Sequence, residues 1–295
     1  MSMNCSRYVK ISMLVTALIA CPAFAQDDPP GNYRLEIGDR PAAPYPALPN
    51  YNARLDRSGV GAEYTIPVAR HHIIPFNVLR AFYNNVIDNG DILLARTFFN
   101  QFGNMIPRYF GANANGCAAN AVDLQAVANM LVNMGFGLIR EGGDNYPQAW
   151  DNFESFYAWM PWNLFIGPEG GRRTDDPGEG FEENAQYIIN DNERFQRLRQ
   201  TYDDMLAYNA NRDTPTLRRI LENLSRLSRR QRVYQLNANQ WESVGNNYRI
   251  RQGGHHELRK REINEDYHYR DKRVLEEDDS CGDIKPDYGV ISVII

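Results

Sequence analysis

Two adjacent histidines, His71 and His72, lie near the end of a segment rich in β-branched residues, which predicts a strand over residues 64–74. The pKa of an imidazole lies near neutrality, so a histidine can take a proton from water at physiological pH. Side chains alternate across a strand, and we therefore expect one imidazole to face a site and the other to pack against the residues that support the strand. This pair is the first candidate for acid–base chemistry.

A second group of polar residues follows much later in the chain. Asn163 lies in the sequence WNLFIGP, within a second predicted strand over residues 157–166. A helix is predicted over residues 181–208, with Asn184 in its first turn. The Gly-rich loop between them carries four charged side chains, Arg172, Arg173, Asp175 and Asp176. The two arginines suit a phosphate group and equally suit surface ion pairs with the two aspartates.

The order of these parts resembles the ββα-metal core of the HNH, or His-Me finger, nucleases, over residues 71–75 and 163–184. The resemblance implies that His72 is the general base and that His71 is a metal ligand or orients its neighbour. It implies that Asn163 holds the turn and the histidine ring. It also implies one divalent metal ion, Mg²⁺ or similar, bound by His71 with Asp176 or Asn184.

The chain departs from the pattern of that family at two places. A helical insertion, residues 76–156, separates the two strands, and no histidine follows on the helix. The last metal ligand must therefore be an amide or a carboxylate.

The function implied by the resemblance is hydrolysis of phosphodiester bonds by an exported, metal-dependent nuclease, with DNA or RNA as substrate. Arg172 and Arg173 would bind substrate phosphate. Such a protein would be a bacterial toxin or effector, with an immunity protein as a possible partner, or a scavenging enzyme.

Two other functions stay open. One is a metal-dependent hydrolase of another substrate. The other is a non-catalytic secreted binding protein, which the segment 194–232 would favour because it holds ten arginines and four acidic residues.

The N-terminus has the pattern of a cleavable secretion signal, residues 1–25. Arg7 and Lys10 precede an apolar run that is too short to span a bilayer, and Ala23-Phe24-Ala25 is a small-x-small cleavage site. Cleavage near Ala25 predicts a secreted or periplasmic protein with no transmembrane segment in the mature chain. The alternative is a lipoprotein cut before Cys21.

Composition limits the remaining possibilities. Of 295 residues, 32 are basic and 37 are acidic, so the chain is not a generally basic nucleic-acid coat. Removal of the signal leaves two cysteines, Cys117 and Cys281, which either form a disulfide or remain buried thiols.

The predicted fold is α+β and mostly helical, with a small antiparallel sheet and a ββα-metal-like core interrupted by the helical insertion. A Pro-rich N-terminal arm, residues 26–62, precedes the α+β domain, residues 63–252. A charged C-terminal extension, residues 253–295, follows it. Another helix is predicted from Thr214, with one apolar stripe made by Leu217, Ile220, Leu221, Leu224 and Leu227.

Overall fold

The computed structural model describes residues 34–35, 40–113 and 153–252. Within these residues the chain forms helices and three two-stranded antiparallel sheets, so the predicted α+β class is confirmed. The predicted signal peptide, most of the helical insertion after residue 113, both Cys117 and Cys281, and the C-terminal extension lie outside the described residues.

The central ribbon is the antiparallel pair of β3 (Val68–His72) and β4 (Leu164–Pro168), in which His72 pairs with Leu164 and His71 with Phe165. All of β4 is buried. On its other edge the amide of Ile166 donates to the carbonyl oxygen of Tyr234, and the amide of Tyr234 donates to that of Leu164. The ribbon therefore joins two segments that the intervening helices separate along the chain.

The second predicted strand was placed too early. Residues 153–158 are helical, and a short 3-10 turn, Pro161–Asn163, leads into β4. Tyr157 and Trp162 are buried in the core from these helical positions. The aromatic residues of this segment therefore indicated that it is buried, and not that it forms a strand.

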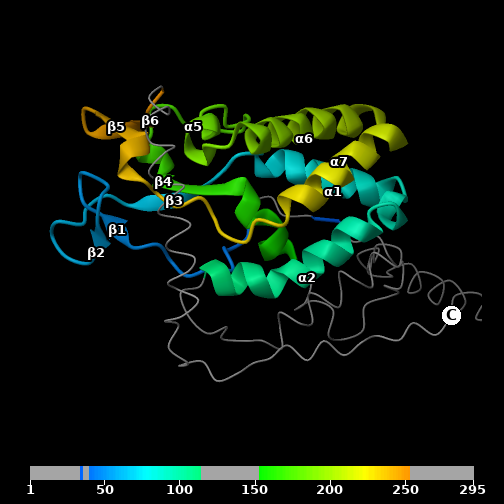
Figure 1. The fold of residues 1–295 in the computed structure, drawn as a ribbon, viewed down its shortest axis with the longest axis horizontal. Helices are drawn as coiled ribbons and strands as arrows, with labels where there is room; N and C mark the ends of the chain where they lie inside the picture. The colour runs from blue at the N-terminus through cyan, green and yellow to red at the C-terminus, as the bar shows by residue number, and fades with distance from the viewer. Residues whose placement is uncertain (1–33, 36–39, 114–152, 253–295) are drawn as a thin grey trace, which may run out of the picture.

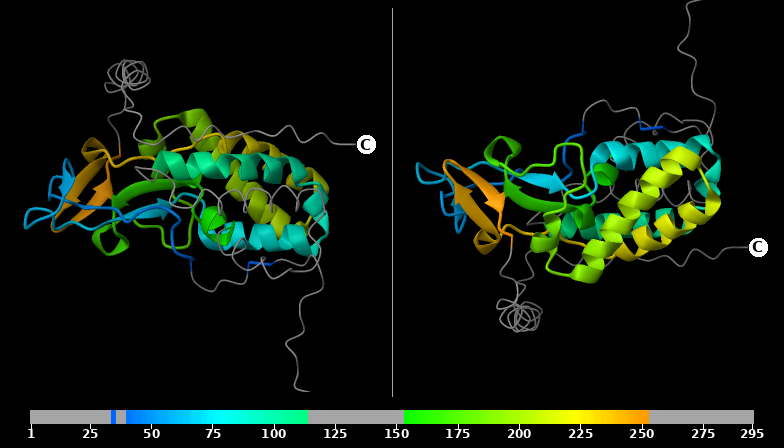
Figure 2. Two further views of the ribbon diagram at one scale, coloured as in Figure 1. Left: turned by 90° about the horizontal axis from the view of Figure 1, so that it is seen from below. Right: turned by 90° about the horizontal axis from the view of Figure 1, so that it is seen from above.

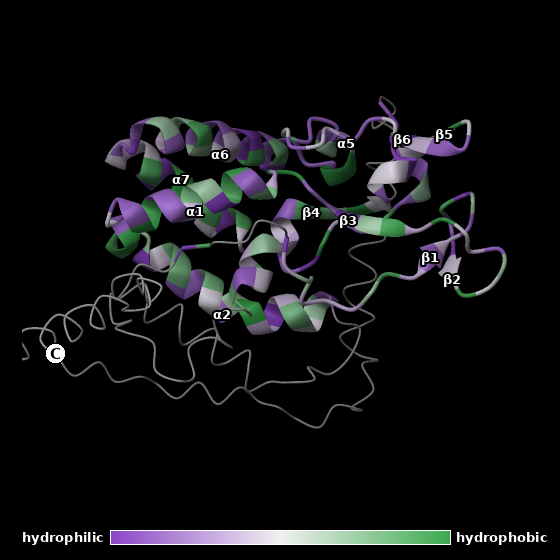
Figure 3. Cartoon of the chain, turned by 180° about the vertical axis from the view of Figure 1, so that it is seen from behind, coloured by the Kyte–Doolittle hydropathy of each residue, from purple (hydrophilic) through white to green (hydrophobic). Residues whose placement is uncertain are grey.

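Four long helices pack beside the ribbon: α1 (Phe76–Asp88), α2 (Arg96–Asn113), α6 (Asn192–Asn211) and α7 (Thr214–Leu227). The helix α6 packs on α1 and α7, and α2 packs on α7. All five residues of the predicted stripe on α7 are buried. Figure 3 shows the alternation of hydrophobic and hydrophilic residues along these helices that one-sided burial requires.

The helix predicted over residues 181–208 is two helices. A short α5 (Ala185–Ile189) ends at Asn190, whose φ of 50° is left-handed, and the side chain of Asp191 then caps α6 by accepting from the amide of Arg194. An asparagine tolerates this conformation better than most residues. The break lets α5 lie near the ribbon while α6 packs on the helices.

Two hairpins lie on the side of the ribbon that faces away from the four long helices (Figures 1 and 2). They are β1 (Asn50–Tyr51) with β2 (Ser58–Gly59), and β5 (Trp241–Val244) with β6 (Asn247–Ile250). Figures 1 and 2 show the β3–β4 ribbon between these hairpins and the four long helices. Among the described residues, no helix combines the length and the apolar character that crossing a membrane requires.

Candidate functional site

The side chain of Asn163 fastens the end of β3 to the start of β4. Its Oδ1 accepts from the amide of Ile74 at 2.7 Å, and its Nδ2 donates to the carbonyl oxygen of Ile74 at 2.8 Å. The backbone carbonyl of Asn163 also accepts from the amide of Ile73. Asn163 is fully buried. It thus holds the chain directly after the two histidines, as predicted, through backbone bonds and not through a bond to a histidine ring.

His71 is buried on one face of the ribbon. Its ring stacks on Phe165 at a centroid distance of 5.2 Å, and its Nε2 lies 2.7 Å from the carbonyl oxygen of Pro168. A carbonyl only accepts, so Nε2 carries the hydrogen and Nδ1 keeps its lone pair. A Cβ at Gly167 would lie 3.4 Å from the His71 ring and 2.4 Å from the Trp241 side chain, so glycine is needed beside this imidazole.

His72 faces the other side of the ribbon, as alternation along a strand predicts. Its Nε2 lies 2.7 Å from the carbonyl oxygen of Ala158, and its ring packs against Trp159 at 5.1 Å. The same tautomer argument leaves the lone pair on Nδ1, which lies 3.4 Å from Nη1 of Arg40. Each imidazole is therefore held by a backbone carbonyl and presents an unprotonated Nδ1.

Both histidines line one cavity of about 320 Å³ at the end of the ribbon. Its walls come from β3, the start of α1, the loop before α5 and residue 40. The ionisable side chains in the wall are those of His71, His72, Arg40, Arg80, Arg173, Asp176, Glu179 and Glu182. The alternation of side chains does not place the two imidazoles in separate cavities, because both line this one.

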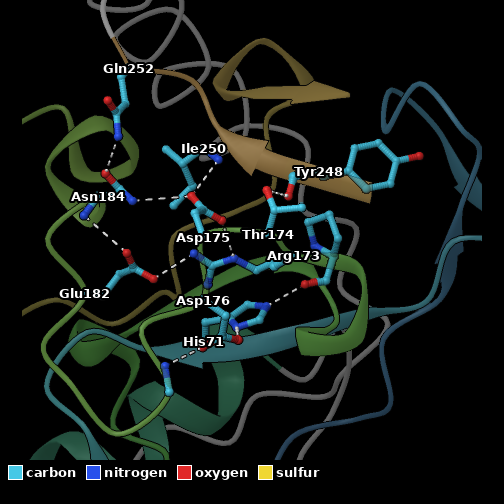
Figure 4. Close-up of polar contacts among 12 residues, drawn as sticks. His71, Arg173, Thr174, Asp175, Asp176, Glu182, Asn184, Tyr248, Ile250 and Gln252 are labelled. Carbon is cyan, nitrogen blue, oxygen red and sulfur yellow. Dashed lines mark hydrogen bonds and ion pairs between the residues drawn. The ribbon is translucent and has the colours of Figure 1, made fainter. Parts of the chain in front are cut away.

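Asp176 provides the carboxylate nearest to a histidine in this cavity. Its Oδ1 accepts from the amide of Gly178, whose φ of 63° closes a turn that suits glycine. Its Oδ2 lies 3.9 Å from Nδ1 of His71. Figure 4 shows this carboxylate beside the ring.

The fit of a divalent ion to these two groups follows from the separation of their atoms. Ligands of one Mg²⁺ at about 2.0–2.1 Å stand roughly 3–4 Å apart, a range that includes the distance from Nδ1 to Oδ2. Within the described residues no set of three or more His, Cys, Asp or Glu side chains is arranged to hold a metal. The donors therefore fit an ion that keeps several waters, as Mg²⁺ does, and do not fit a closed structural zinc site.

Arg173 is buried beside His71 and is held by two carboxylates. Its Nε donates to Asp175 at 3.2 Å and its Nη2 to Glu182 at 2.8 Å, while its guanidinium lies over the rings of Phe165 and Trp241. Its Nη1 is buried and has no hydrogen-bond partner in the described structure. A buried charged donor without a partner costs free energy, so this atom points to an anionic ligand.

Besides Asn163, two predicted site residues lie outside the cavity wall. Arg172 directs Nη1 to the carbonyl oxygen of Asn246, 3.4 Å away. The amide of Asn184 donates to Asp175 and accepts from Gln252, as Figure 4 shows. Neither residue is in the cavity wall, so the structure supports neither a phosphate contact from Arg172 nor a metal ligand at Asn184. Asn184 lies directly before α5, and its side chain contacts Asp175 and Gln252 instead of the cavity.

Neither Arg40 nor Glu182 was predicted from the sequence to be a site residue. Arg40 lies in the Pro-rich arm, where no periodicity distinguishes it from other exposed arginines. Glu182 precedes α5, and only the fold brings its carboxylate to Arg173.

Burial has a measurable consequence for stability at low pH. Burial, reinforced for His71 by Arg173 and for His72 by Arg40, lowers the pKa of each histidine from 6.5 to about 4, although the carbonyl hydrogen bonds oppose the shift. The unfolded chain therefore takes up these protons first as the pH falls. Stability present above pH 6.5 is lost between about pH 6.5 and pH 4, by at most about 3 kcal/mol per histidine.

Urea unfolding of the metal-free protein in EDTA, compared between pH 7 and pH 4.5, measures this loss. A His72→Gln variant should show a smaller drop in midpoint than the wild type, since it lacks one of the two protons taken up on unfolding. Equal drops in the two proteins would contradict the shifted pKa of His72. Comparing the drops cancels the contribution of the carboxylates that both proteins share.

Comparison with known proteins finds a partial relative. No protein-family model and no solved structure matches the chain. It is 36% identical over 161 residues to "Putative protein p9" of Acyrthosiphon pisum secondary endosymbiont phage 1. That match covers 51% of the chain and 42% of the phage protein, so the chain spans less than half of the relative's length. The name of the phage protein states no activity.

Proposed function

We propose that this protein is a metal-dependent nuclease of the HNH, or His-Me finger, type, which hydrolyses phosphodiester bonds in DNA or RNA. One observation carries the proposal. The two imidazoles on β3 each present Nδ1 at a single cavity beside Asp176, while Asn163 of β4 fastens the chain that follows them. A base, a carboxylate for a hard cation and a donor for phosphate are the groups that this reaction needs.

His72 acts as the general base in this proposal. The bond from its Nε2–H to Ala158 fixes the ring, so Nδ1 is the nitrogen that takes the proton from water. Burial lowers the pKa of this imidazole, so it is neutral at physiological pH and Nδ1 carries the lone pair that takes the proton, while the lower pKa also makes it a weaker base than a free histidine. Asn163 is a positioning residue, because it contacts the backbone of Ile74 and not the cavity.

His71 and Asp176 would hold the divalent ion, which supplies neutralisation of charge on the phosphate and on the leaving oxygen. Arg173 would donate from its unpaired Nη1 to a phosphate oxygen. Asp175 and Glu182 hold the guanidinium in place for that contact, so Arg173 does not have to order itself when substrate arrives.

Removal of one metal-binding carboxylate should change the metal requirement. Asp176→Asn is expected to raise the Mg²⁺ concentration for half-maximal cleavage by about tenfold or more, since a ligand charge is lost. The measurement is cleavage rate against Mg²⁺ concentration. Glu169→Gln is the matched control, because it removes the same charge from an exposed position of the same loop, outside the cavity wall, and should leave the requirement nearly unchanged. Identical Mg²⁺ curves for Asp176→Asn and wild type would contradict the assignment.

The site of action proposed here is outside the cytoplasm, after cleavage near Ala25. The charged and then apolar order of the first residues supports export, with lipidation at Cys21 as the alternative outcome. N-terminal sequencing of the exported protein distinguishes the two. A toxin role with an immunity protein stays a prediction.

A further inference from the structure

Residues 41–46, called the strap below, are held by hydrogen bonds at both ends, to Trp159 at one end and to Arg70 of β3 at the other. The indole Nε1 of Trp159 donates to the carbonyl oxygen of Pro41 at 2.7 Å, and the hydroxyl of Tyr45 donates to the carbonyl oxygen of Trp159 at 3.0 Å. Nη2 of Arg70 on β3 donates to the carbonyl oxygen of Pro46 at 2.7 Å. Three of the six strap residues are prolines, which restrict the backbone further. The strap therefore fixes the position of the backbone directly after the residue that precedes it.

That residue is Arg40, whose guanidinium reaches the cavity wall beside His72. Its neighbour there is the Nδ1 of a neutral imidazole, at 3.4 Å, and no carboxylate among the described residues pairs with it. An uncharged nitrogen at this distance is a weak partner for a guanidinium. An anionic oxygen would be a stronger one, because charge-assisted hydrogen bonds are shorter and stronger than those to neutral groups.

A second guanidinium with an unused donor lines the same cavity. This is Arg173, whose buried Nη1 has no partner in the described structure. Arg173 lies beside His71, and Arg40 lies beside His72. The two arginines thus line the same cavity from separate segments, each next to one of the two imidazoles.

We propose that Arg40 is a substrate-binding residue that the strap carries to the site from outside the ββα unit. Its guanidinium binds a non-bridging oxygen of the substrate phosphate and leaves Nδ1 of His72 to the attacking water. The phosphate then lies between Arg40 and Arg173, within reach of the general base. The identity of the substrate rests on the proposed function. The binding of an anion rests on the geometry of the cavity.

Binding of inorganic phosphate to the metal-free protein, measured by calorimetry in EDTA, tests the anion site apart from any cleavage. Arg40→Ala is expected to raise the Kd by about tenfold or more, the loss expected for one hydrogen bond to a charged group. Arg40→Lys should fall between the two, because it keeps the charge and loses the fork. Arg54→Ala, an exposed arginine outside the cavity wall, is the control and should bind like wild type. A wild type that binds no phosphate, or equal Kd values for Arg40→Ala and Arg54→Ala, would overturn the proposal.

Cleavage kinetics separate this inference from the proposed function. If the protein cleaves nucleic acid, Arg40→Ala should raise KM by a similar factor and change kcat less. If no cleavage occurs while the phosphate result holds, the nuclease proposal fails and the anion site stands.

If the strap positions Arg40, the effects of Trp159→Phe and Arg40→Ala on phosphate binding should not be additive. Trp159→Phe removes the donor to Pro41 and keeps an aromatic ring against His72. It should weaken phosphate binding less than Arg40→Ala does, and it should have no effect in a protein that already carries Arg40→Ala. An equal effect of Trp159→Phe in both backgrounds would show that Trp159 does not act through Arg40.

Discussion

His72→Ala is expected to lower the rate of phosphodiester cleavage by about 10²–10⁴-fold, the usual contribution of a general base. The Mg²⁺ concentration for half-maximal rate should stay close to that of the wild type, because His72 does not face Asp176. His71→Ala should behave differently and raise that concentration, since it removes the nitrogen 3.9 Å from Asp176. Cleavage rate measured against Mg²⁺ for both variants separates a base from a ligand.

The loss of activity must be distinguished from a loss of folding. His72→Ala also removes a hydrogen bond to Ala158 and packing against Trp159. Tyr208→Phe is a suitable control, because it removes a hydrogen bond to Asp91 among the helices, away from the cavity. It should lower the urea midpoint and keep activity. If the two histidine variants shift the Mg²⁺ curve identically, the division of roles between them is wrong.

Asn163→Ala is expected to cost about 2–5 kcal/mol of unfolding free energy. The substitution leaves the amide and the carbonyl of Ile74 buried without their partners, and each such group costs about 1–3 kcal/mol. Asn163→Asp should also destabilise, since a carboxylate oxygen would replace Nδ2 and face the carbonyl of Ile74. Urea unfolding at neutral pH measures both effects.

The chain offers a closely matched control for that prediction. The amide side chain of Asn84 on α1 makes the same two bonds to the backbone of Leu35, at a part-buried position. Asn84→Ala should cost less stability and leave activity intact, because the pair lies outside the cavity wall. Equal costs and equal activities for the two alanine variants would mean that Asn163 has no special part in positioning the histidines.

The parts of the site that depend on local pattern were predicted well. The alternation along residues 68–72 indicated that the imidazoles face opposite sides, and the motif order indicated that the two strands lie together, although the Asn163 side chain bonds to Ile74 and not to an imidazole. The apolar stripe on α7 was predicted residue by residue, because the period of a helix is written in the sequence.

The parts that depend on backbone direction were not predictable. The two carbonyl oxygens that set the histidine tautomers, those of Pro168 and Ala158, have no side-chain signature. Asn184 was a reasonable metal ligand by position, but a left-handed residue at Asn190 ends α5 after one turn and the amide faces Asp175. Arg40 reaches the cavity through a strap whose anchors are backbone oxygens.

Ion pairs offset part of the positive charge of residues 194–232. Four of the segment's ten arginines, Arg197, Arg199, Arg219 and Arg226, each form an ion pair with a carboxylate. Two of these carboxylates, Glu183 and Glu193, lie outside the segment and so offset part of its excess positive charge. The cavity, by contrast, places two arginines beside the two histidines.

Cleavage of a supercoiled plasmid and of a single-stranded RNA by the protein without its predicted signal, residues 26–295, tests the central claim most directly. With Mg²⁺ the account predicts nicked and linear DNA or shortened RNA, none of it in EDTA or with His72→Ala. A folded protein that leaves both substrates intact in Mg²⁺ and in Mn²⁺, or cleavage that His72→Ala does not slow, would contradict it.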